Sequence, residues 1–122
     1  MAKDSYLRCL YTNANSIVNK MSELRDRVNN GAYDIVGITE TWASESINDA
    51  ELKIDGYNMY RKDRTKSRGG GLILYISSTI RAGINEEAMT KTEFDESLWC
   101  NVELSCKKVL VGLCYRSPTS TA

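Results

Sequence analysis

Hydrophobic and polar positions along the chain form blocks that predict a strand followed by a helix. Residues 6–12 are rich in aromatic and β-favouring side chains and predict a first strand. After a polar break, hydrophobic residues recur at intervals of four, three and four positions, which is one face of a helix over residues 16–30. These positions are Ile17, Met21, Leu24 and Val28. Asn15 or Ser16 can cap this helix, and Gly31 is placed to end it.

The helix leads into a short and mostly apolar segment. Residues 33–39 predict a strand that is buried on both faces. Strand, helix and strand in about 35 residues form a βαβ unit, whose two strands are parallel. The carboxyl ends of parallel strands share one edge of a sheet, where α/β proteins place groups that bind ligands.

The remaining chain predicts mainly β structure. Strands are expected over residues 57–61, 72–77, 97–104 and 109–115. The polar segment 105–108 joins the last two as a hairpin. Residues 48–53 predict a helical turn. Residues 80–92 are less regular, and an acidic stretch begins within them and runs to residue 96.

Charge and composition exclude several classes of function. Sixteen basic and sixteen acidic residues cancel, so no overall charge draws the chain to nucleic acid or membrane. The chain has no histidine, which excludes an imidazole base, a Ser/His or Cys/His pair and a His-ligated zinc within it. The segment 61–68 carries five positive residues and one negative. It could contact phosphates, or it could be a solvated loop whose charge the acidic stretch before residue 97 partly offsets.

The N-terminus and the cysteines indicate the compartment. The N-terminal segment of nine residues is polar in character and has no apolar core stretch, so no secretory signal is expected. The apolar runs of the chain are far shorter than the ~20 residues that span a bilayer. We therefore expect an intracellular protein, nuclear or cytoplasmic, that is not secreted and has no membrane partner. The four cysteines contain no C-x-x-C pair, and three of them lie in strand-like runs. Reduced and mostly buried thiols are expected, with a disulfide framework or an all-cysteine metal site as alternatives.

Polar residues at the predicted strand ends are the candidates for metal binding. Glu40 follows the second strand, and Asn13 and Asn15 follow the first. If the two strands are neighbours, these oxygens can meet at one edge, and Mg²⁺ prefers such hard donors. The alternatives are a solvated carboxylate for Glu40 and turn or cap roles for the two asparagines.

Two further features could contact phosphate. Tyr115 and Arg116 end the last strand, where a phenol and a guanidinium could hold a phosphate or simply pack. The glycines at 69–71 precede a strand and not a helix, so a phosphate-cradling loop is a poor reading. We expect them to permit a sharp turn or a close backbone approach.

Five segments taken in order resemble a known family. They read YTNANSI, DIVGITETW, YNMYRKDRTKSRGGGLILYI, ESLWCNVEL and VLVGLCYRSPTS. Together they are similar to the first half of the endonuclease/exonuclease/phosphatase superfamily, most closely to the endonuclease domain of non-LTR retrotransposon polyproteins. The resemblance implies an α/β fold, the first half of a four-layer α/β/β/α sandwich, with one mixed sheet and a helix on one face. It also implies a divalent-metal phosphodiesterase that cuts DNA.

The resemblance assigns roles to individual residues. Asn13 matches the family's active-site asparagine, and Asn15 resembles a nearby position that helps the metal site. Glu40 matches the metal-binding glutamate, and Tyr115 matches the tyrosine that contacts the scissile phosphate.

Two arginines are implied as weaker contacts to phosphate or nucleic acid. Arg68 opens the glycine-rich entry to a strand, and Arg116 begins a segment that resembles the family's Arg-Pro-Pro.

The family's second half has no counterpart in these 122 residues. Its Gly-Asp-x-Asn and Ser-Asp-His motifs are missing, and with them the groups that orient and deprotonate water. We therefore expect residues 1–122 to be a partial domain that binds Mg²⁺ weakly or not at all and has little activity alone. Two packed sheets with outer helices need about 200 residues or more. The apolar runs 35–38 and 109–114 then predict a sheet with one uncovered face, which would self-associate, bind a complementary half or precipitate.

Two functions remain open at this point. One is the N-terminal part of a Mg-dependent DNA endonuclease. The other is a non-catalytic remnant that acts as a pairing or nucleic-acid-binding module.

Overall fold

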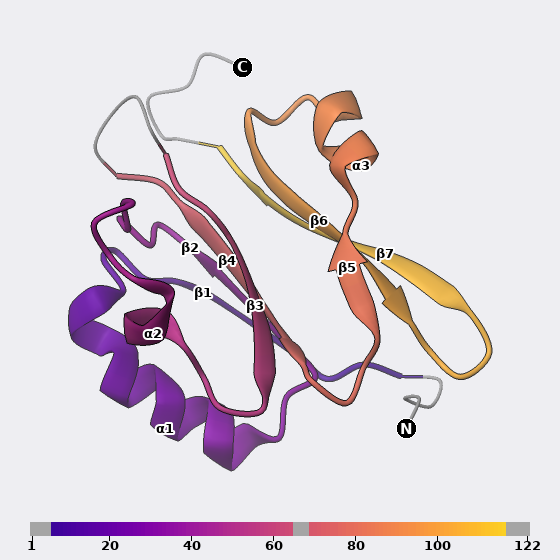
Figure 1. Ribbon diagram of the computed structural model, residues 1–122, viewed down its shortest axis with the longest axis horizontal. Helices are drawn as coiled ribbons and strands as arrows, with labels where there is room; N and C mark the ends of the chain where they lie inside the picture. The colour runs from indigo at the N-terminus through magenta and orange to yellow at the C-terminus, as the bar shows by residue number, and fades with distance from the viewer. Residues whose placement is uncertain (1–5, 65–68, 117–122) are drawn as a thin grey trace.

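Strands supply most of the regular structure, and they form two sheets that pack face to face. The computed structural model describes residues 6–64 and 69–116. Figure 1 shows the first sheet with a helix on its outer side and the second sheet against its other side. The mixed sheet with a helix on one face confirms the α/β sandwich expected from the sequence.

The first sheet contains four strands in the order β1-β2-β4-β3. Its strands are β1 (Cys9–Asn13), β2 (Ile35–Thr39), β3 (Tyr57–Lys62) and β4 (Leu72–Ser77). β1 and β2 are parallel, as the βαβ pattern predicts, and Asn13 lies opposite Thr39. β4 is antiparallel to both of its neighbours. The ends of β1 and β2 therefore meet at one edge of the sheet.

One face of this sheet is covered by the predicted helix. It begins with a 3-10 turn, η1 (Val18–Lys20), and continues as α1 (Met21–Gly31). The apolar face is buried as the periodicity predicts, against Val36 and Ile38 of β2. A short helix, α2 (Asp49–Leu52), begins with a capping box between Asn48 and Glu51 and closes the same side of the core.

The predicted ends of the α1 segment are wrong in detail. No side-chain cap hydrogen bond starts either η1 or α1, and Asn15 and Ser16 instead adopt positive φ values of 46° and 81°. At the other end Gly31 is the last helical residue, and Ala32 takes the left-handed conformation at φ 50°. Gly31 is needed for space, because a Cβ there would lie 2.1 Å from the Tyr33 ring.

The second sheet is antiparallel, in the order β5-β6-β7. Its strands are β5 (Ala82–Ile84), β6 (Glu96–Glu103) and β7 (Lys108–Tyr115). β6 and β7 form the predicted hairpin, with Glu96 opposite Tyr115. The segment 80–92, which the sequence predicts only as less regular, contains β5 and also α3 (Glu86–Lys91), where the Asn85 side chain accepts a hydrogen bond from the backbone N–H of Ala88.

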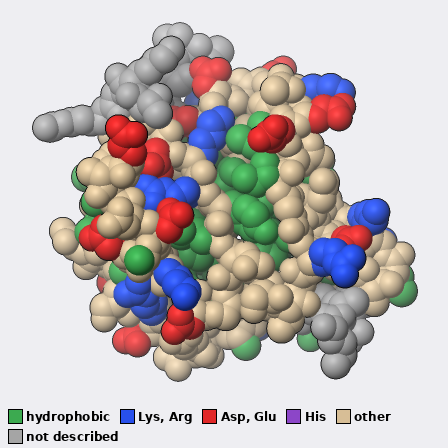
Figure 2. Space-filling view, in the orientation of Figure 1, with side chains coloured by type: hydrophobic (Ala, Val, Ile, Leu, Met, Phe, Trp, Pro, Cys, Tyr) green, Lys and Arg blue, Asp and Glu red, His purple; other side chains and the backbone are tan. Residues whose placement is uncertain are grey.

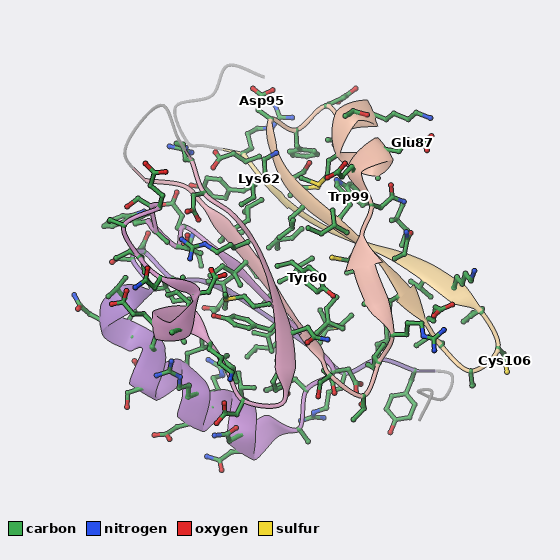
Figure 3. All side chains as sticks on the ribbon, in the orientation of Figure 1. Tyr60, Lys62, Glu87, Asp95, Trp99 and Cys106 are labelled. Carbon is green, nitrogen blue, oxygen red and sulfur yellow. The ribbon has the colours of Figure 1, made fainter. Side chains whose placement is uncertain are left out.

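The second sheet covers the face of the first sheet that was predicted from the sequence to be uncovered. Ile35, Leu74 and Ile76 of the first sheet pack with Leu98 and other residues of β6 and β7 in one buried cluster. The expectation of a bare sheet face is therefore wrong: the same chain supplies the cover, through a hairpin that crosses to the other layer. Figure 2 shows hydrophobic side chains gathered between the two layers, and Figure 3 places Tyr60 there.

One side of the sandwich is open, in the sense that the strand edges there are unpaired within the described residues. β1 and β7 are the end strands of their sheets. β7 lies against β2 and β4. In β1, Cys9 and Tyr11 share a face with Ile35 and are exposed, Tyr11 by 59%. Neither strand edge is paired within the described residues.

The cysteines are only partly buried. All four are free, but Cys100 alone is fully buried; Cys9 and Cys106 are exposed, and Cys114 is half-buried. The prediction of mostly buried thiols is therefore wrong, because two of the four lie on the edge strand β1 and at the tip of the β6–β7 hairpin (Figure 3).

No helix in the described part of the chain is long and apolar enough to cross a membrane.

Candidate active site

Glu40 lies at the centre of the candidate site, immediately after β2. Its carboxylate accepts hydrogen bonds from the Tyr115 hydroxyl and the Gly70 backbone N–H. It also accepts one from the Trp42 indole Nε1, at 2.9 Å from Oε2. Glu40 follows a strand of the first sheet and Tyr115 ends a strand of the second, so packing of the two sheets brings these predicted site residues together.

These hydrogen bonds set the charge of the pair. The Tyr115 hydrogen bond is the main cause that lowers the pKa of Glu40, with smaller contributions in the same direction from Trp42, Gly70 and the nearby Arg64. Partial burial opposes them. The same bond raises the pKa of Tyr115 to about 12. At neutral pH, Glu40 is thus an anion and Tyr115 a protonated donor.

Asn13 and Asn15 lie in the loop that follows β1. Asn13 is exposed, and its Oδ1 accepts a hydrogen bond from the Asn15 N–H at 3.2 Å. The loop is tied to the end of β2, because the Ser16 N–H donates to the Glu40 carbonyl oxygen at 2.9 Å. The two asparagines are therefore at the sheet edge that carries Glu40, as the βαβ unit predicts.

Arg64 and Glu96 form a second layer of the site that the sequence reasoning missed. Arg64 donates two hydrogen bonds to the Glu96 carboxylate, one from Nε at 3.3 Å and one from the terminal nitrogen Nη2. Glu96 lies beside Tyr115 through the pairing of β6 with β7. The charge on Arg64 also acts on Glu40 and Tyr115. The two residues are 32 positions apart, and only the stacking of the sheets makes them neighbours.

The glycines at 69–71 form one wall of the site and do not cradle a phosphate before a helix. All three have positive φ. A Cβ on Gly70 would lie 2.4 Å from Arg64 Nε and from Glu96 Oε1, and one on Gly71 would lie 2.3 Å from Thr41 Oγ1. The expectation of a close backbone approach is therefore confirmed.

The basic segment is less available for phosphates than its charge suggests. Within its described part, Arg61 pairs with Asp63 at 2.8 Å and with Asp49, and Arg64 pairs with Glu96. Lys62 donates to the Asp95 carbonyl oxygen (Figure 3).

The two predicted arginine contacts have different outcomes. Arg116 is exposed, and its guanidinium lies 5.1 Å from the centre of the Phe94 ring, which is a cation–π geometry. Arg68 lies outside the described residues.

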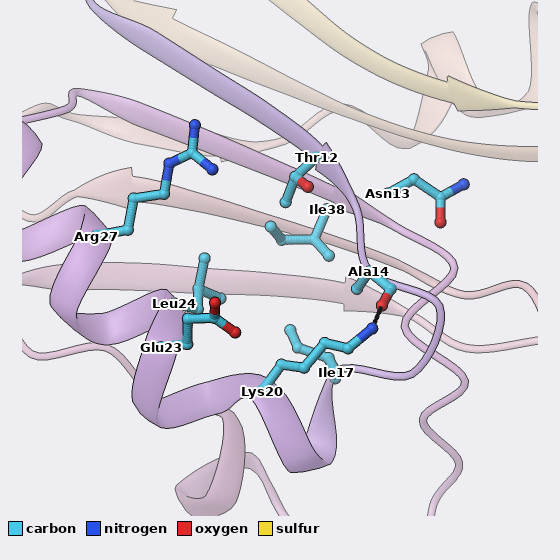
Figure 4. Close-up of a pocket in the computed structure, with 9 residues that line it drawn as sticks. All are labelled: Thr12, Asn13, Ala14, Ile17, Lys20, Glu23, Leu24, Arg27 and Ile38. Atoms are coloured by element: carbon cyan, nitrogen blue, oxygen red, sulfur yellow. Dashed lines mark hydrogen bonds between the residues drawn. The ribbon is translucent and has the colours of Figure 1, made fainter.

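A pocket of about 200 Å³ adjoins Asn13 on the helix side of β1 (Figure 4). Lys20, Glu23 and Arg27 of the helical segment supply its charged side chains. Lys20 is already engaged, because its ammonium donates to the carbonyl oxygen of Ala14. The pocket does not include Glu40 and is not the candidate site.

The oxygen donors at Glu40 are of the chemical type that a hard cation prefers. They comprise one ionised carboxylate and the amide oxygen of Asn13, and Mg²⁺ typically binds proteins through one or two carboxylates and several waters. Within the described residues no group of three or more acidic, cysteine or histidine side chains could hold a metal. Glu96 is committed to Arg64, so Glu40 is the carboxylate left for a cation.

Comparison with known proteins supports the fold. No family model and no curated protein matches the sequence. Among solved structures, the AP endonuclease LMAP from Leishmania major superposes with a TM-score of 0.71 over 94% of this chain at 17% identity. The 3′ phosphatase NExo from Neisseria, bound to a product DNA hairpin, gives 0.57 over 86% at 13% identity. The chain spans only 41% and 40% of those two proteins. It thus shares the α/β fold of part of these two structures, and this is the fold that the sequence resemblance implies.

Proposed function

We propose that the chain is the N-terminal part of a Mg-dependent phosphodiesterase, a DNA endonuclease of the kind found in non-LTR retrotransposons. The observation that carries the proposal is the meeting of Glu40 and Tyr115 across two sheets, with Asn13 at the same edge. The five sequence segments, taken in their order along the chain, support the assignment to retrotransposon endonucleases. One of the two solved structures is an AP endonuclease by name, and the other is a 3′ phosphatase bound to a product DNA hairpin, which supports DNA as the partner.

The residues have distinct roles in this proposal. Glu40 holds the cation, and Asn13 and Asn15 contribute oxygens directly or through water. A bound Mg²⁺ would neutralise charge on a phosphodiester and act as a Lewis acid. Tyr115, kept protonated by its raised pKa, donates a hydrogen bond to a phosphate oxygen once Glu40 turns to the cation. Arg116 is exposed at the end of the same strand and can contact the DNA backbone.

Activity of this chain alone should be close to background. General acid–base catalysis typically contributes about 10²–10⁴-fold. Among the described residues, no side chain beside Glu40 is a free base: Glu96 is bound to Arg64, and the chain has no histidine.

Cation binding and DNA nicking test the proposal together. Calorimetric titration with Mg²⁺ should show weak binding that Glu40→Gln abolishes. Plasmid nicking by the wild type should not exceed that of Glu40→Gln. A wild type that binds no Mg²⁺, or a Glu40→Gln variant that binds it equally well, would overturn the proposal. Nicking that depends on Glu40 would show instead that the chain completes its own catalytic centre.

A complementary partner is the second element of the proposal, and the open side of the sandwich is where it would bind. The β1 edge has no charged residue over its five positions, and an edge without such protection can pair with another strand. We propose that the missing half of the fold, or a second copy of this chain, pairs along β1 and covers Tyr11.

Self-association can be measured directly. Sizing chromatography at micromolar concentration should show a dimer or larger species, and Tyr11→Lys should shift it toward monomer. A wild-type monomer would leave only the complementary half as the occupant. A wild-type dimer unaffected by Tyr11→Lys would contradict pairing at this edge.

The alternative function is a non-catalytic module that pairs with protein or nucleic acid. The favouring observation is the small number of catalytic groups near Glu40. This alternative predicts DNA binding that is unchanged by Glu40→Gln and independent of Mg²⁺, measured by fluorescence anisotropy at fixed salt.

A further inference from the structure

The Arg64–Glu96 pair touches the backbone that holds Glu40. Glu96 Oε1 accepts a hydrogen bond from the Gly71 N–H at 3.2 Å, in addition to the bonds from Arg64. Both side chains are about one-fifth exposed. Gly70 is buried under them, so closely that a side chain at this position would collide with both. The pair therefore clamps the turn formed by Gly70 and Gly71.

The turn formed by Gly70 and Gly71 holds the strained loop that contains Glu40 and Trp42. Glu40 and Trp42 both have φ of 56°, a left-handed conformation that non-glycine residues adopt only where their surroundings impose it. The Trp42 N–H donates to the Gly70 carbonyl oxygen at 2.8 Å, and the Gly70 N–H donates to the Glu40 carboxylate. The Thr41 N–H donates to the Gly71 carbonyl oxygen at 3.3 Å. The two glycines thus fix the backbone on both sides of Thr41 and the carboxylate of Glu40.

We propose that Arg64 and Glu96 are positioning residues that set the orientation of the Glu40 carboxylate through Gly70 and Gly71. This inference rests on the proposed function for its purpose, since Glu40 is the cation ligand in that proposal. It assigns a role in the site to two residues that contact neither the cation nor the scissile bond.

The charge of the pair favours positioning over phosphate binding. Arg64 is neutralised by Glu96, and Glu40 adds a further negative charge nearby. A phosphate approaching Arg64 would have to displace one carboxylate in the field of another, and the Coulomb energy opposes this. Arg64 consequently acts on Glu40 indirectly, through the backbone of Gly70 and Gly71.

The first test needs no metal. The Trp42 indole N–H reports directly on Glu40, because it donates to the Glu40 carboxylate. The chain has two tryptophans, so a Trp99→Phe variant assigns the indole signals in an NMR spectrum. Arg64→Ala and Glu96→Ala should each shift the Trp42 indole signal. Each should also speed exchange of the Trp42 backbone amide by about tenfold, the equivalent of one lost hydrogen bond.

A neighbouring ion pair provides the matched control. Arg61 and Asp63 form two hydrogen bonds at similar burial but do not contact the glycine turn. Asp63→Ala should leave the Trp42 indole signal and amide exchange at wild-type values. Arg64→Lys keeps the charge and packs with less disturbance. It should show an intermediate indole shift, and it carries the test if Arg64→Ala does not fold.

The second test links the pair to the cation. Titration with Mg²⁺, followed by Trp42 fluorescence in the Trp99→Phe background, should show affinity reduced about tenfold by Glu96→Ala, as for loss of one fixed ligand orientation. Asp63→Ala should have no effect, and Arg64→Ala/Glu96→Ala should be no worse than either single variant, because the two residues act as one unit.

The outcomes separate the two proposals. Unchanged indole signal and amide exchange in both Arg64→Ala and Glu96→Ala would overturn the positioning role, whatever the cation result. Equal effects of Asp63→Ala would overturn it too, since a general loosening would then explain the data. A wild type that binds no Mg²⁺ would overturn the proposed function alone, and the metal-free test would still decide the role of the pair.

Discussion

Contact between Gly37 and Leu113 sets how closely the two sheets approach, and a size exchange at this contact tests it. Gly37 lies in the middle of β2, and a Cβ built on it would lie 3.2 Å from Leu113 Cδ1. Leu113 lies on the same face of β7 as Tyr115, two residues further on, and is 7% exposed. The same contact therefore governs how Tyr115 reaches Glu40.

The magnitudes follow from this geometry. Gly37→Val pushes three carbon atoms into the Leu113 side chain, and such overpacking costs about 1–3 kcal/mol. Better strand propensity than glycine returns only about 0.5–1 kcal/mol. Leu113→Ala should cost about 2–5 kcal/mol through lost contacts and a cavity. In the double variant the valine fills that cavity, so Gly37→Val should cost nothing further once Leu113 is alanine.

Urea unfolding followed by far-ultraviolet circular dichroism measures the four free energies of unfolding. The matched control combines Gly37→Val with Leu24→Ala, because Leu24 is 8% exposed but packs on the opposite face of the sheet. That pair should be additive. Additivity within about 0.5 kcal/mol for Gly37 and Leu113 as well would refute the packing of the second sheet on the first.

Three further measurements test individual groups. Burial raises the pKa of Cys100 to about 11 from 9.0. The folded state therefore keeps this proton longer than the unfolded chain, and the stability that Cys100 contributes is complete below pH 9 and lost as pH rises to about 11. The free energy of unfolding should fall over this window by up to about 1.4 kcal/mol per pH unit more in the wild type than in Cys100→Ala; equal slopes would contradict it. Ser97 is fully buried, and its Oγ has no hydrogen-bond partner among the described residues. Ser97→Ala should therefore raise the melting temperature or leave it unchanged, since no bond is lost, and a drop of several degrees would indicate a partner. Tyr115→Phe removes the main donor to Glu40 and should raise the pKa of Glu40, measured by carboxyl-carbon NMR; an unchanged pKa would show that Tyr115 does not bond Glu40 in solution.

Local patterns predicted most of the elements because each carries its own signal. The helical face of α1, the apolar run of β2 and the β6–β7 hairpin all lie within a residue or two of their expected positions, apart from the helix start. α3 was missed although signals were present: Asn85 as an N-cap, acidic residues in the first turn and the pair of Glu87 with Lys91 at i, i+4. The acidic run was read only as charge.

Other elements depend on tertiary contacts that no local pattern shows. β5 has three residues, one of them glycine, and exists because it pairs with β6. The uncovered sheet face was predicted because all the apolar runs were assigned to one sheet. Alternation cannot show that a hairpin passes to a second layer.

The site divides in the same way. Glu40 and Asn13 could be predicted because they follow parallel neighbouring strands, and strand ends meet at one edge whatever the rest of the fold does. Tyr115 could be singled out as a phenol at a strand end, but only the family resemblance placed it in one site with Glu40, because it comes from the other sheet. Arg64 and Glu96 were counted only as charges of a basic and an acidic segment. Their pairing depends on how the two sheets are positioned relative to each other, and no local sequence pattern shows this.

Stacking of the sheets also explains how the candidate site residues can be in place in a chain that spans about two fifths of the two solved structures. The hydrogen bonds at Glu40 come from β7, from the glycine turn before β4 and from Trp42, and all of these belong to this chain. Each compensates for part of the cost of holding an anion at the sheet edge without a cation. The same donors must be displaced when a cation binds, so this chain should bind Mg²⁺ more weakly than a site with a second carboxylate. Such a carboxylate, supplied across the open edge beside β1, would increase the affinity without changing the position of Glu40.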